Sequence, residues 1–182
     1  MDSTQTDTEL PCPICGQNTV TSTEILREFP YIGTTKIYTL RCQNEACDFK
    51  ETDIDPQERQ EPVSQKYVLR SPEGLSTRVV RSSNGEIYFE GVGSILPGRR
   101  TTGFVTNIEG IINRMLEKIS FYEQSIEAEE DRALLRKRRA ALEDAKKGLE
   151  PLTIYMVDDT GNSAILSPET ENIDPTKVRD SQ

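Results

Sequence analysis

The sequence contains no histidine, the side chain on which many enzyme and metal sites depend. A Ser-His-Asp or Cys-His nucleophile system is therefore excluded, and so is a two-histidine iron site. Any zinc in this chain must be held by cysteine thiolates, with carboxylates as a remote alternative. We expect the protein not to be an enzyme.

Long apolar runs are also missing. No segment reaches about 18 consecutive apolar residues, so the sequence predicts no transmembrane helix. The first residues, Met1 to Asp7, lack the basic and apolar regions of a signal peptide. We therefore expect a cytoplasmic protein, in which paired cysteines are metal ligands more often than disulfides.

Positive charge is scarce: 22 Lys and Arg stand against 31 Asp and Glu, a net charge of −9. Because phosphate contacts need a basic face, this balance disfavours a nucleic-acid partner. The dense basic cluster at 136–139 is interpreted as a solvated helix face, and docking on an acidic partner surface or RNA is the alternative. Arg99 and Arg100 have the same two interpretations.

All four cysteines lie in one stretch of the chain. Cys12 and Cys15 form a C-x2-C pair, and Cys42 and Cys47 form a C-x4-C pair after 26 intervening residues. Two such pairs at the ends of a hairpin can place four thiolates at the corners of a tetrahedron, which structural zinc prefers. We predict a four-cysteine zinc ribbon with one structural Zn²⁺; four buried or disulfide-bonded cysteines are the alternative. A site closed by four thiolates has no open position for a catalytic water.

The chain is predicted to have two structured parts. A zinc ribbon covers residues 11–55, and a β domain covers residues 63–168, with a polar linker bounded by Pro56 and Pro62 between them. Polar, acidic composition predicts a disordered leader at 1–10 and a flexible acidic tail at 169–182.

Alternating apolar and polar residues predict short strands in both parts, at 19–29, 32–40, 49–54, 65–70, 75–82, 86–91, 152–157 and 163–166. Two turn signals, Ser83-Asn84-Gly85 and Asp158 to Asn162, predict β-hairpins.

A helical period appears in the middle of the β domain. An apolar stripe with helical spacing follows Thr106 and Asn107, either of which is a suitable N-cap: Ile108, Ile111, Ile112, Met115, Leu116 and Ile119. A second helix is expected at about 129–147, stopped by Gly148 and Pro151. Together they predict a helical hairpin at about 107–149.

Three stretches together resemble the ZPR-one zinc-finger family. They are Cys-Pro-Ile-Cys-Gly at 12–16 with the later cysteine pair, the Thr-x-x-Glu-Gly stretch at 106–110, and the Asp-x-x-Gly-Asn-Ser turn at 158–163. The resemblance covers about residues 10–168 and is closest to the single-module archaeal members. It implies a mainly β fold with an α insertion: a four-cysteine zinc ribbon followed by a double-stranded β-helix-like domain with an inserted helical hairpin.

The same resemblance implies a function. The family binds the translation elongation factor one-alpha GTPase and is thought to act as a folding chaperone or regulator of translation. It implies partner-binding roles for Thr106, Glu109, Asp158, Asp159, Gly161, Asn162 and Ser163. For the 158–163 turn and for Glu109-Gly110, a purely structural role is the alternative, because these residue types also suit a tight turn and a helix N-terminus.

The sequence departs from the family at two points. The family usually spaces the second cysteine pair as C-x2-C followed by Gly, whereas this chain has C-x4-C followed by Asp48, and Asp159 stands at the turn proline. The alternative function is a nucleic-acid-binding zinc ribbon in transcription or on the ribosome. The near charge balance of the finger disfavours it.

Overall fold

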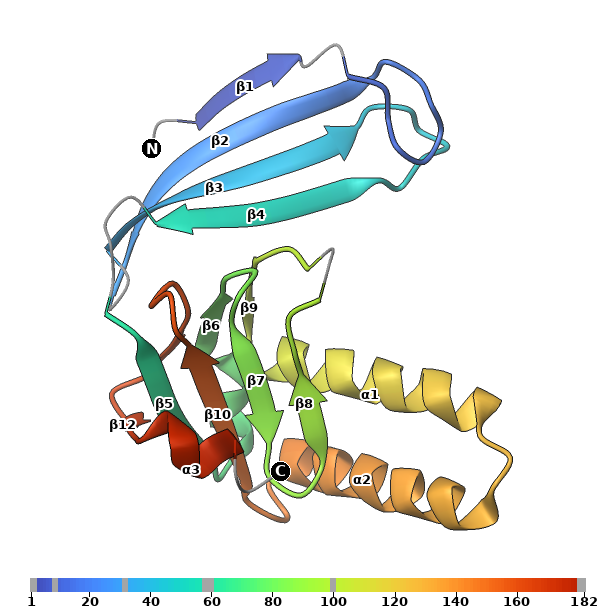
Figure 1. The fold of residues 1–182 in the computed structure, drawn as a ribbon, viewed down its shortest axis with the longest axis vertical. Coiled ribbons are helices and arrows are strands. Elements are labelled where there is room, and N and C mark those ends of the chain that lie inside the picture. Colours follow the sequence, from blue (N-terminus) through green and yellow to red (C-terminus); the bar gives the residue numbers. More distant parts are fainter. Residues whose placement is uncertain (1–2, 8–9, 31–32, 57–60, 99–100, 180–182) are drawn as a thin grey trace.

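The computed structural model describes residues 3–7, 10–30, 33–56, 61–98 and 101–179. One sheet, with its cysteine loops at one end, lies above a second body of two further sheets, and a pair of helices extends sideways from that second body (Figure 1). We call the first part the ribbon and the second the β domain. The described residues contain no helix long and apolar enough to cross a membrane.

The ribbon is a four-stranded antiparallel sheet in the order β1-β2-β3-β4. Its strands are β1 (Ser3–Asp7), β2 (Val20–Phe29), β3 (Gly33–Cys42) and β4 (Lys50–Pro56). β2 and β3 form a long hairpin with Val20 opposite Cys42, which brings the two cysteine loops to the same end of the sheet.

The expected disordered leader is wrong for Ser3–Asp7, which pair with Thr21–Ile25 as strand β1. The free edge of β2 offers backbone N–H and C=O groups to any adjacent extended chain, whatever its side chains. The amino-acid composition of a segment therefore does not reveal that it can form such an edge strand. Residues 1–2 and 8–9 of the leader, and residues 57–60 of the linker, lie outside the described residues.

The β domain has the expected double-stranded β-helix-like architecture, in which two sheets pack against each other. Its strands are β5 (Val63–Leu69), β6 (Arg78–Arg81), β7 (Glu86–Phe89), β8 (Gly93–Ile95), β9 (Phe104–Asn107), β10 (Leu152–Asp158), β11 (Ala164–Leu166) and β12 (Glu171–Asn172), with a 3-10 helix at Pro72–Ser76. They form one sheet in the order β12-β5-β10-β7-β8 and a second in the order β11-β6-β9. A single apolar core joins both sheets to the helices, with Leu69, Phe89, Ile112 and Ile154 fully buried in it.

Both predicted turns exist, but neither closes a hairpin. β6 and β7, on either side of the 83–85 turn, lie in different sheets, and so do β10 and β11 around the 158–162 turn. Turn residues fix a local reversal of the chain, whereas the strand partner is decided by long-range packing. In this fold each turn carries the chain from one sheet to the other.

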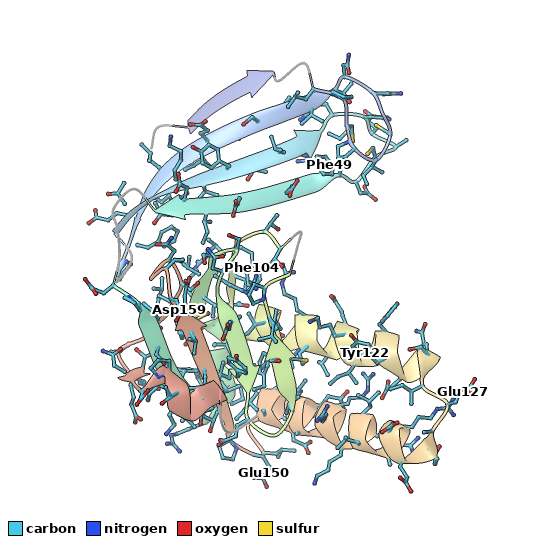
Figure 2. All side chains as sticks on the ribbon, viewed as in Figure 1. Phe49, Phe104, Tyr122, Glu127, Glu150 and Asp159 are labelled. Carbon is cyan, nitrogen blue, oxygen red and sulfur yellow. The ribbon has the colours of Figure 1, made fainter. Side chains whose placement is uncertain are left out.

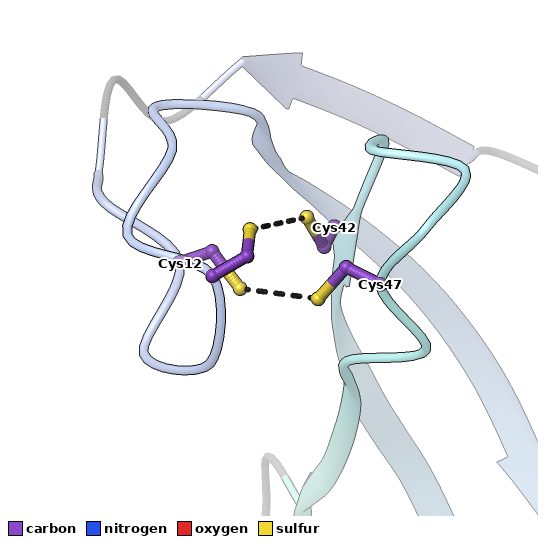
Figure 3. Close-up of side chains that lie close together, drawn as sticks. Cys12, Cys42 and Cys47 are labelled. Atoms are coloured by element: carbon purple, nitrogen blue, oxygen red, sulfur yellow. Dashed lines mark hydrogen bonds between the residues drawn. The ribbon is translucent and has the colours of Figure 1, made fainter.

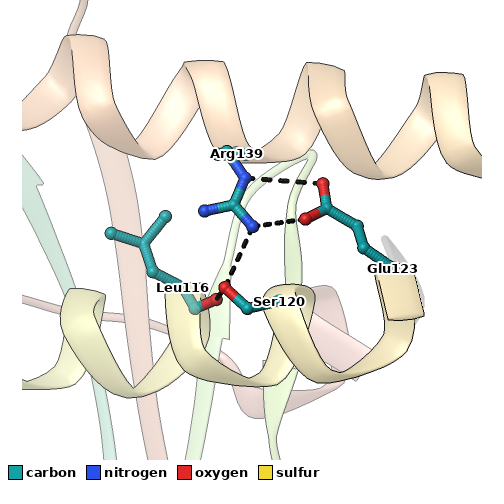
Figure 4. Close-up of polar contacts among 4 residues, drawn as sticks. All are labelled: Leu116, Ser120, Glu123 and Arg139. Carbon is teal, nitrogen blue, oxygen red and sulfur yellow. Dashed lines mark hydrogen bonds and ion pairs between the residues drawn. The ribbon is translucent and has the colours of Figure 1, made fainter. Parts of the chain in front are cut away.

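The helical hairpin is present as α1 (Ile108–Ser125) and α2 (Glu129–Lys147). Asn107 is the N-cap of α1, and its side chain accepts a hydrogen bond of 2.8 Å from the Gly110 N–H. At the far end, the guanidinium of Arg139 on α2 pairs with the Glu123 carboxylate and donates to Ser120 Oγ on α1 (Figure 4). α2 ends at Gly148, which has the left-handed conformation that glycine adopts most easily (φ +73°).

The predicted flexible tail is also wrong in part. Glu171–Asn172 (β12) pair with β5, and α3 (Pro175–Arg179) places Val178 in a small apolar cluster where it is 1% exposed. Val178 packs there with Tyr88 and Val157. A few apolar residues are enough to dock a segment whose overall composition is polar. Residues 180–182 lie outside the described residues.

The ribbon and the β domain are joined through β4. Ile54 packs in one apolar cluster with Val80 and Ala164 of the β domain. Beside it, the Asp53 carboxylate accepts a hydrogen bond of 3.1 Å from the Gly103 N–H. The contact is close, because a Cβ on Gly103 would lie 2.7 Å from an Ile54 side-chain carbon.

Candidate metal centre

The four cysteines meet at one end of the ribbon. Cys12 and Cys15 lie on the loop before β2. Cys42 is the last residue of β3, and Cys47 lies on the loop that follows it, opposite Cys12 (Figure 3). Cys12 and Cys42 are 2% and 4% exposed and pack with Val20, whereas Cys15 lies on the surface. Two of the four cysteines are therefore anchored in an apolar cluster, Cys47 is half-buried and Cys15 is exposed.

The sulfur positions fit a tetrahedral metal. The Sγ atoms of Cys12 and Cys47 lie 3.7 Å apart, as do those of Cys15 and Cys42, and all four sulfurs lie within 4.8 Å of one another. A zinc–sulfur distance of about 2.3 Å gives a tetrahedron whose sulfur–sulfur edges are about 3.8 Å. A disulfide needs about 2.0 Å, so these cysteines are free thiols arranged as a ligand set.

Backbone geometry supports both loops. Gly16 has φ +72°, and its N–H donates to the Cys12 carbonyl at 2.8 Å, which closes the first loop tightly. The longer C-x4-C loop is closed by Asn44, whose carbonyl accepts from the Cys47 N–H at 2.9 Å and whose side chain accepts from the Ala46 N–H at 3.1 Å. The two extra residues thus form a turn that still delivers Cys47 to the cluster.

The cluster does not favour four thiolates without a cation. The backbone N–H of Gln17 is the main reason that the pKa of Cys15 falls from 9.0 to about 7. At Cys47 the Phe49 N–H lowers the pKa, but burial and the neighbouring sulfurs together raise it to about 12. A divalent cation removes this conflict, because it stabilises every thiolate that it binds.

One neighbour of the centre was missed from the sequence. The Thr19 hydroxyl lies 3.2 Å from Cys42 Sγ, so it can donate to that sulfur. The spacing rule looks only at cysteines, and a threonine at the start of a predicted strand carries no signal of its own. Hydrogen bonds to ligand atoms orient them and tune the metal.

The 158–163 turn is held together from inside. Asp158 is 1% exposed, and its carboxylate accepts from Ser82 Oγ at 2.6 Å and from Ser163 Oγ at 2.5 Å. Its other oxygen accepts from the Thr160 N–H at 2.8 Å and from the Thr160 hydroxyl. Asp158, Gly161 and Ser163 are buried, so direct contact of these three with a partner is disfavoured.

Two predicted partner residues of this turn reach the surface: Asp159 is exposed and Asn162 is half-buried. Figure 2 labels Asp159 at the side of the β domain that faces the ribbon. A purely structural role therefore fits Asp158 and Ser163 well. Within this turn, contact with a partner is open only to Asp159 and Asn162 among the predicted residues.

Thr106 and Glu109 flank the start of α1. Thr106 is half-buried on β9, opposite Val79 of β6. Glu109 is exposed and pairs with Lys146 of α2 at 3.1 Å. Both therefore have a structural role at the base of the helical hairpin, and Glu109 still presents its carboxylate to the surface.

The basic cluster at 136–139 is partly used within the hairpin. Arg136 pairs with Glu129, and Arg139 pairs with Glu123. These pairs agree with the interpretation of a helix face rather than a docking site. Arg99 and Arg100 lie outside the described residues.

Known proteins resemble this chain over nearly its whole length. Residues 73–181 match the family model of the ZPR1 jelly-roll domain. An uncharacterised ZPR1-like protein of Pyrococcus horikoshii is 34% identical over 171 residues, covering 91% of this chain and 76% of that protein. A ZPR1-like protein of Methanocaldococcus jannaschii is 35% identical over 166 residues, covering 89% of this chain and 82% of that protein.

A longer relative matches more weakly. The zinc finger protein ZPR1 homologue of Caenorhabditis elegans is 27% identical over 178 residues, covering 90% of this chain but only 36% of that protein. A jelly roll is the double-stranded architecture of the β domain, and a zinc finger protein is what the four-thiol cluster leads one to expect. The chain belongs to the ZPR1 family, and it carries one module of the archaeal ZPR1 type with a structural zinc centre.

Proposed function

We propose that this chain is a non-enzymatic zinc-binding protein whose partner is the translation elongation factor one-alpha GTPase, and that it acts in the cytoplasm as a folding chaperone of that GTPase or as a regulator of translation. The observation that carries the proposal is the combination of a closed four-thiol centre with a jelly-roll domain in one chain of the ZPR1 family. The identity of the partner follows from the family resemblance.

Cys12, Cys15, Cys42 and Cys47 are the proposed zinc ligands. Zinc stabilises the fold here and leaves no coordination position for a substrate, since four thiolates complete the tetrahedron. With no histidine in the sequence, the jelly roll also lacks the usual ligands of a catalytic metal. Binding is the function that remains.

The test is direct binding to the purified GTPase. The zinc-loaded chain is mixed with the GTPase in its GDP-bound, GTP-bound and nucleotide-free forms, and with GTPase diluted from denaturant. We expect a stoichiometric complex in at least one state, and a higher refolding yield if the chain is a chaperone. No binding in any state, and no effect on refolding, would refute the proposal.

A pair of charge-reversal variants locates the contact. Asp159→Lys reverses the charge of an exposed residue in the 158–163 turn, and Glu169→Lys reverses the charge of an exposed residue outside that turn. We expect weaker binding only for Asp159→Lys. Salt-dependent RNA binding by the wild-type chain at physiological ionic strength would instead favour the nucleic-acid-binding function.

A further inference from the structure

A cleft of about 960 Å³ opens between the ribbon and the β domain. Its walls come from Lys50 and Thr52 of β4, from the segment 101–105, and from the outer face of α1. Figure 2 labels Phe104 in the space below the ribbon sheet and Tyr122 farther out along α1. The volume lies within the range of about 300–1,000 Å³ that is typical of ligand sites.

The charge of this cleft is opposite to that of the chain. Four cationic side chains line it among the described residues, against the single carboxylate of Glu117: Lys50, Arg81, Arg114 and Lys118. The protein as a whole has a net charge of −9. Such a local reversal favours an anionic occupant.

Arg81 is the unusual member of this set. It is 1% exposed, and its Nη1 makes only a long contact of 3.5 Å with the Thr102 carbonyl. Its Nε and Nη2 are buried and have no hydrogen-bond partner among the described residues. Asp158 attracts the positive charge of Arg81, but both Asp158 oxygens already accept hydrogen bonds from hydroxyl and N–H donors. Arg81 therefore still lacks an acceptor for these nitrogens among the described residues.

The ring of Phe104 contacts two guanidinium groups. Arg81 Cζ is 5.4 Å from the ring centroid, and Arg114 Cζ is 4.4 Å from it. Like charges held on one ring repel, and an anion between or beside them relieves that repulsion. An ionised carboxylate has about four acceptor sites on its two oxygens, so it can accept hydrogen bonds from both guanidinium groups.

The outer part of the cleft is apolar. Leu96, Phe121 and Tyr122 line it and are 49%, 68% and 52% exposed, unusually large fractions for such side chains. A ligand that fits must therefore carry an acid and, next to it, an apolar or aromatic group. An acidic peptide segment has this chemistry; a bare phosphate backbone does not.

We propose that this cleft binds an acidic segment of the protein partner, with a carboxylate held by Arg81 and Arg114 and a neighbouring apolar side chain packed against Leu96 and Phe121. The inference rests on the proposed protein-binding function but not on the identity of the partner. It assigns the contact surface to the junction of ribbon and jelly roll.

The test uses two peptides that differ only in charge: acetyl-Leu-Glu-Glu-Phe-amide and acetyl-Leu-Gln-Gln-Phe-amide. Each is titrated into the zinc-loaded full chain while the amide resonances of Gly103 and Phe104 are followed by NMR. We expect the glutamate peptide to shift both resonances and to bind at least about tenfold more tightly than the glutamine peptide. Equal binding of the two, or no shift at millimolar peptide, would overturn the proposal.

Matched variants separate the cleft from general charge. Arg114→Gln removes a cation of the cleft, and Lys137→Gln removes an exposed cation of α2 that does not line it. We expect about a tenfold loss of glutamate-peptide binding for Arg114→Gln only. Inorganic phosphate and additional glutamate peptide are then compared as competitors of the bound glutamate peptide. If phosphate displaces the bound peptide at the lower concentration, the site belongs to a small phosphate and the peptide assignment is wrong.

The GTPase-binding assay on the same variants distinguishes the two proposals. If the wild type binds the GTPase and Arg114→Gln binds it equally well, the cleft assignment fails while the function stands. If the wild type binds the glutamate peptide but never the GTPase, the cleft stands and the partner is a different protein.

Discussion

Replacing Asp158 by alanine should destabilise the β domain strongly. Its carboxylate is 1% exposed and accepts from Ser82 Oγ on one segment and from Ser163 Oγ on another. Ser163 Oγ in turn accepts from the Ser82 N–H at 2.9 Å, so one carboxylate organises a junction between residues far apart in the sequence. Alanine leaves those buried hydroxyls without their acceptor.

The magnitude follows from which donors stay buried. Thr160 is exposed, so its N–H and hydroxyl find water after the change and contribute little. Ser82 and Ser163 are 3% and 0% exposed, and each loses a hydrogen bond to a charged acceptor, which is worth about 1.5–3 kcal/mol. Allowing for non-additivity, we expect unfolding free energy to fall by about 3–5 kcal/mol, and Tm by roughly 10 °C.

Urea unfolding at constant zinc concentration measures this loss, with Asp159→Ala as the matched control. Asp159 is the exposed neighbour in the same turn, and its replacement should cost less than about 1 kcal/mol. If Asp158→Ala and Asp159→Ala unfold at the same urea concentration, the junction described above contributes nothing to stability. Loss of GTPase binding by a fully stable Asp158→Ala would show that the turn is a contact site instead.

Three further changes test other parts of the structure. The purified chain should contain one zinc ion by elemental analysis, because structural zinc in small fingers contributes on the order of 10 kcal/mol of binding free energy. Cys42→Ser should lose the ion, because it removes one of the four thiolates that hold it. Gly148→Ala should cost about 2 kcal/mol in urea unfolding, since φ is +73° and the added Cβ would lie 2.8 Å from a proline ring carbon; Gly91→Ala, with φ +70° and open space, should cost about half as much. Arg139→Ala should cost about 1 kcal/mol and Arg136→Ala less than about 0.5 kcal/mol, because the ion pair of Arg139 is 29% and 26% exposed and that of Arg136 is 58% and 72% exposed. Equal losses within either matched pair would contradict the structural reasons given.

The helical hairpin was predictable because its signals are local. Of the stripe predicted for α1, Leu116 is half-buried and the other residues, Ile108, Ile111, Ile112, Met115 and Ile119, are buried. The N-cap at Asn107 was one of the two candidates. Side-chain spacing and capping act within a few residues, so the sequence alone carries this information.

The strand pairing was not predictable in the same way. The alternating pattern identifies β10 as a strand, but both of its partners, β5 and β7, lie tens of residues earlier along the chain. The turn at 158–162 suggested pairing with β11 instead, which in fact pairs with β6. A strand shows which residues face the core, and the identity of its neighbours depends on how the whole core closes.

The metal centre and the cleft represent two extremes of predictability. Cysteines have few other uses at such spacing, so the ligand set could be read from the sequence. Arg81 stands after Arg78-Val79-Val80 in a short strand, and nothing in that pattern tells which arginine points inward. Arg78 is exposed, whereas Arg81 is buried, because only the second lies beneath Phe104 and the segment before it.

The buried charge of Arg81 makes sense if binding and stability compete at this position. A guanidinium with two buried nitrogens that have no partner among the described residues costs the folded protein several kcal/mol of desolvation, by the usual magnitude for buried ionic groups. An apolar side chain of similar volume would fill the same space without that cost. Retaining the charge therefore has a physical rationale when an external carboxylate completes its hydrogen bonds.

Strand β4 connects the metal centre with the cleft. It begins at Lys50, three positions after Cys47, and Lys50 lines the cleft. Farther along the same strand, Asp53 and Ile54 contact Gly103, the residue next to Phe104. Zinc holds one end of β4 through the Cys47 loop, while the contact with Gly103 holds the strand against the β domain. In the proposed binding mode the metal would act without any chemistry of its own, by fixing the strand that forms one wall of the cleft.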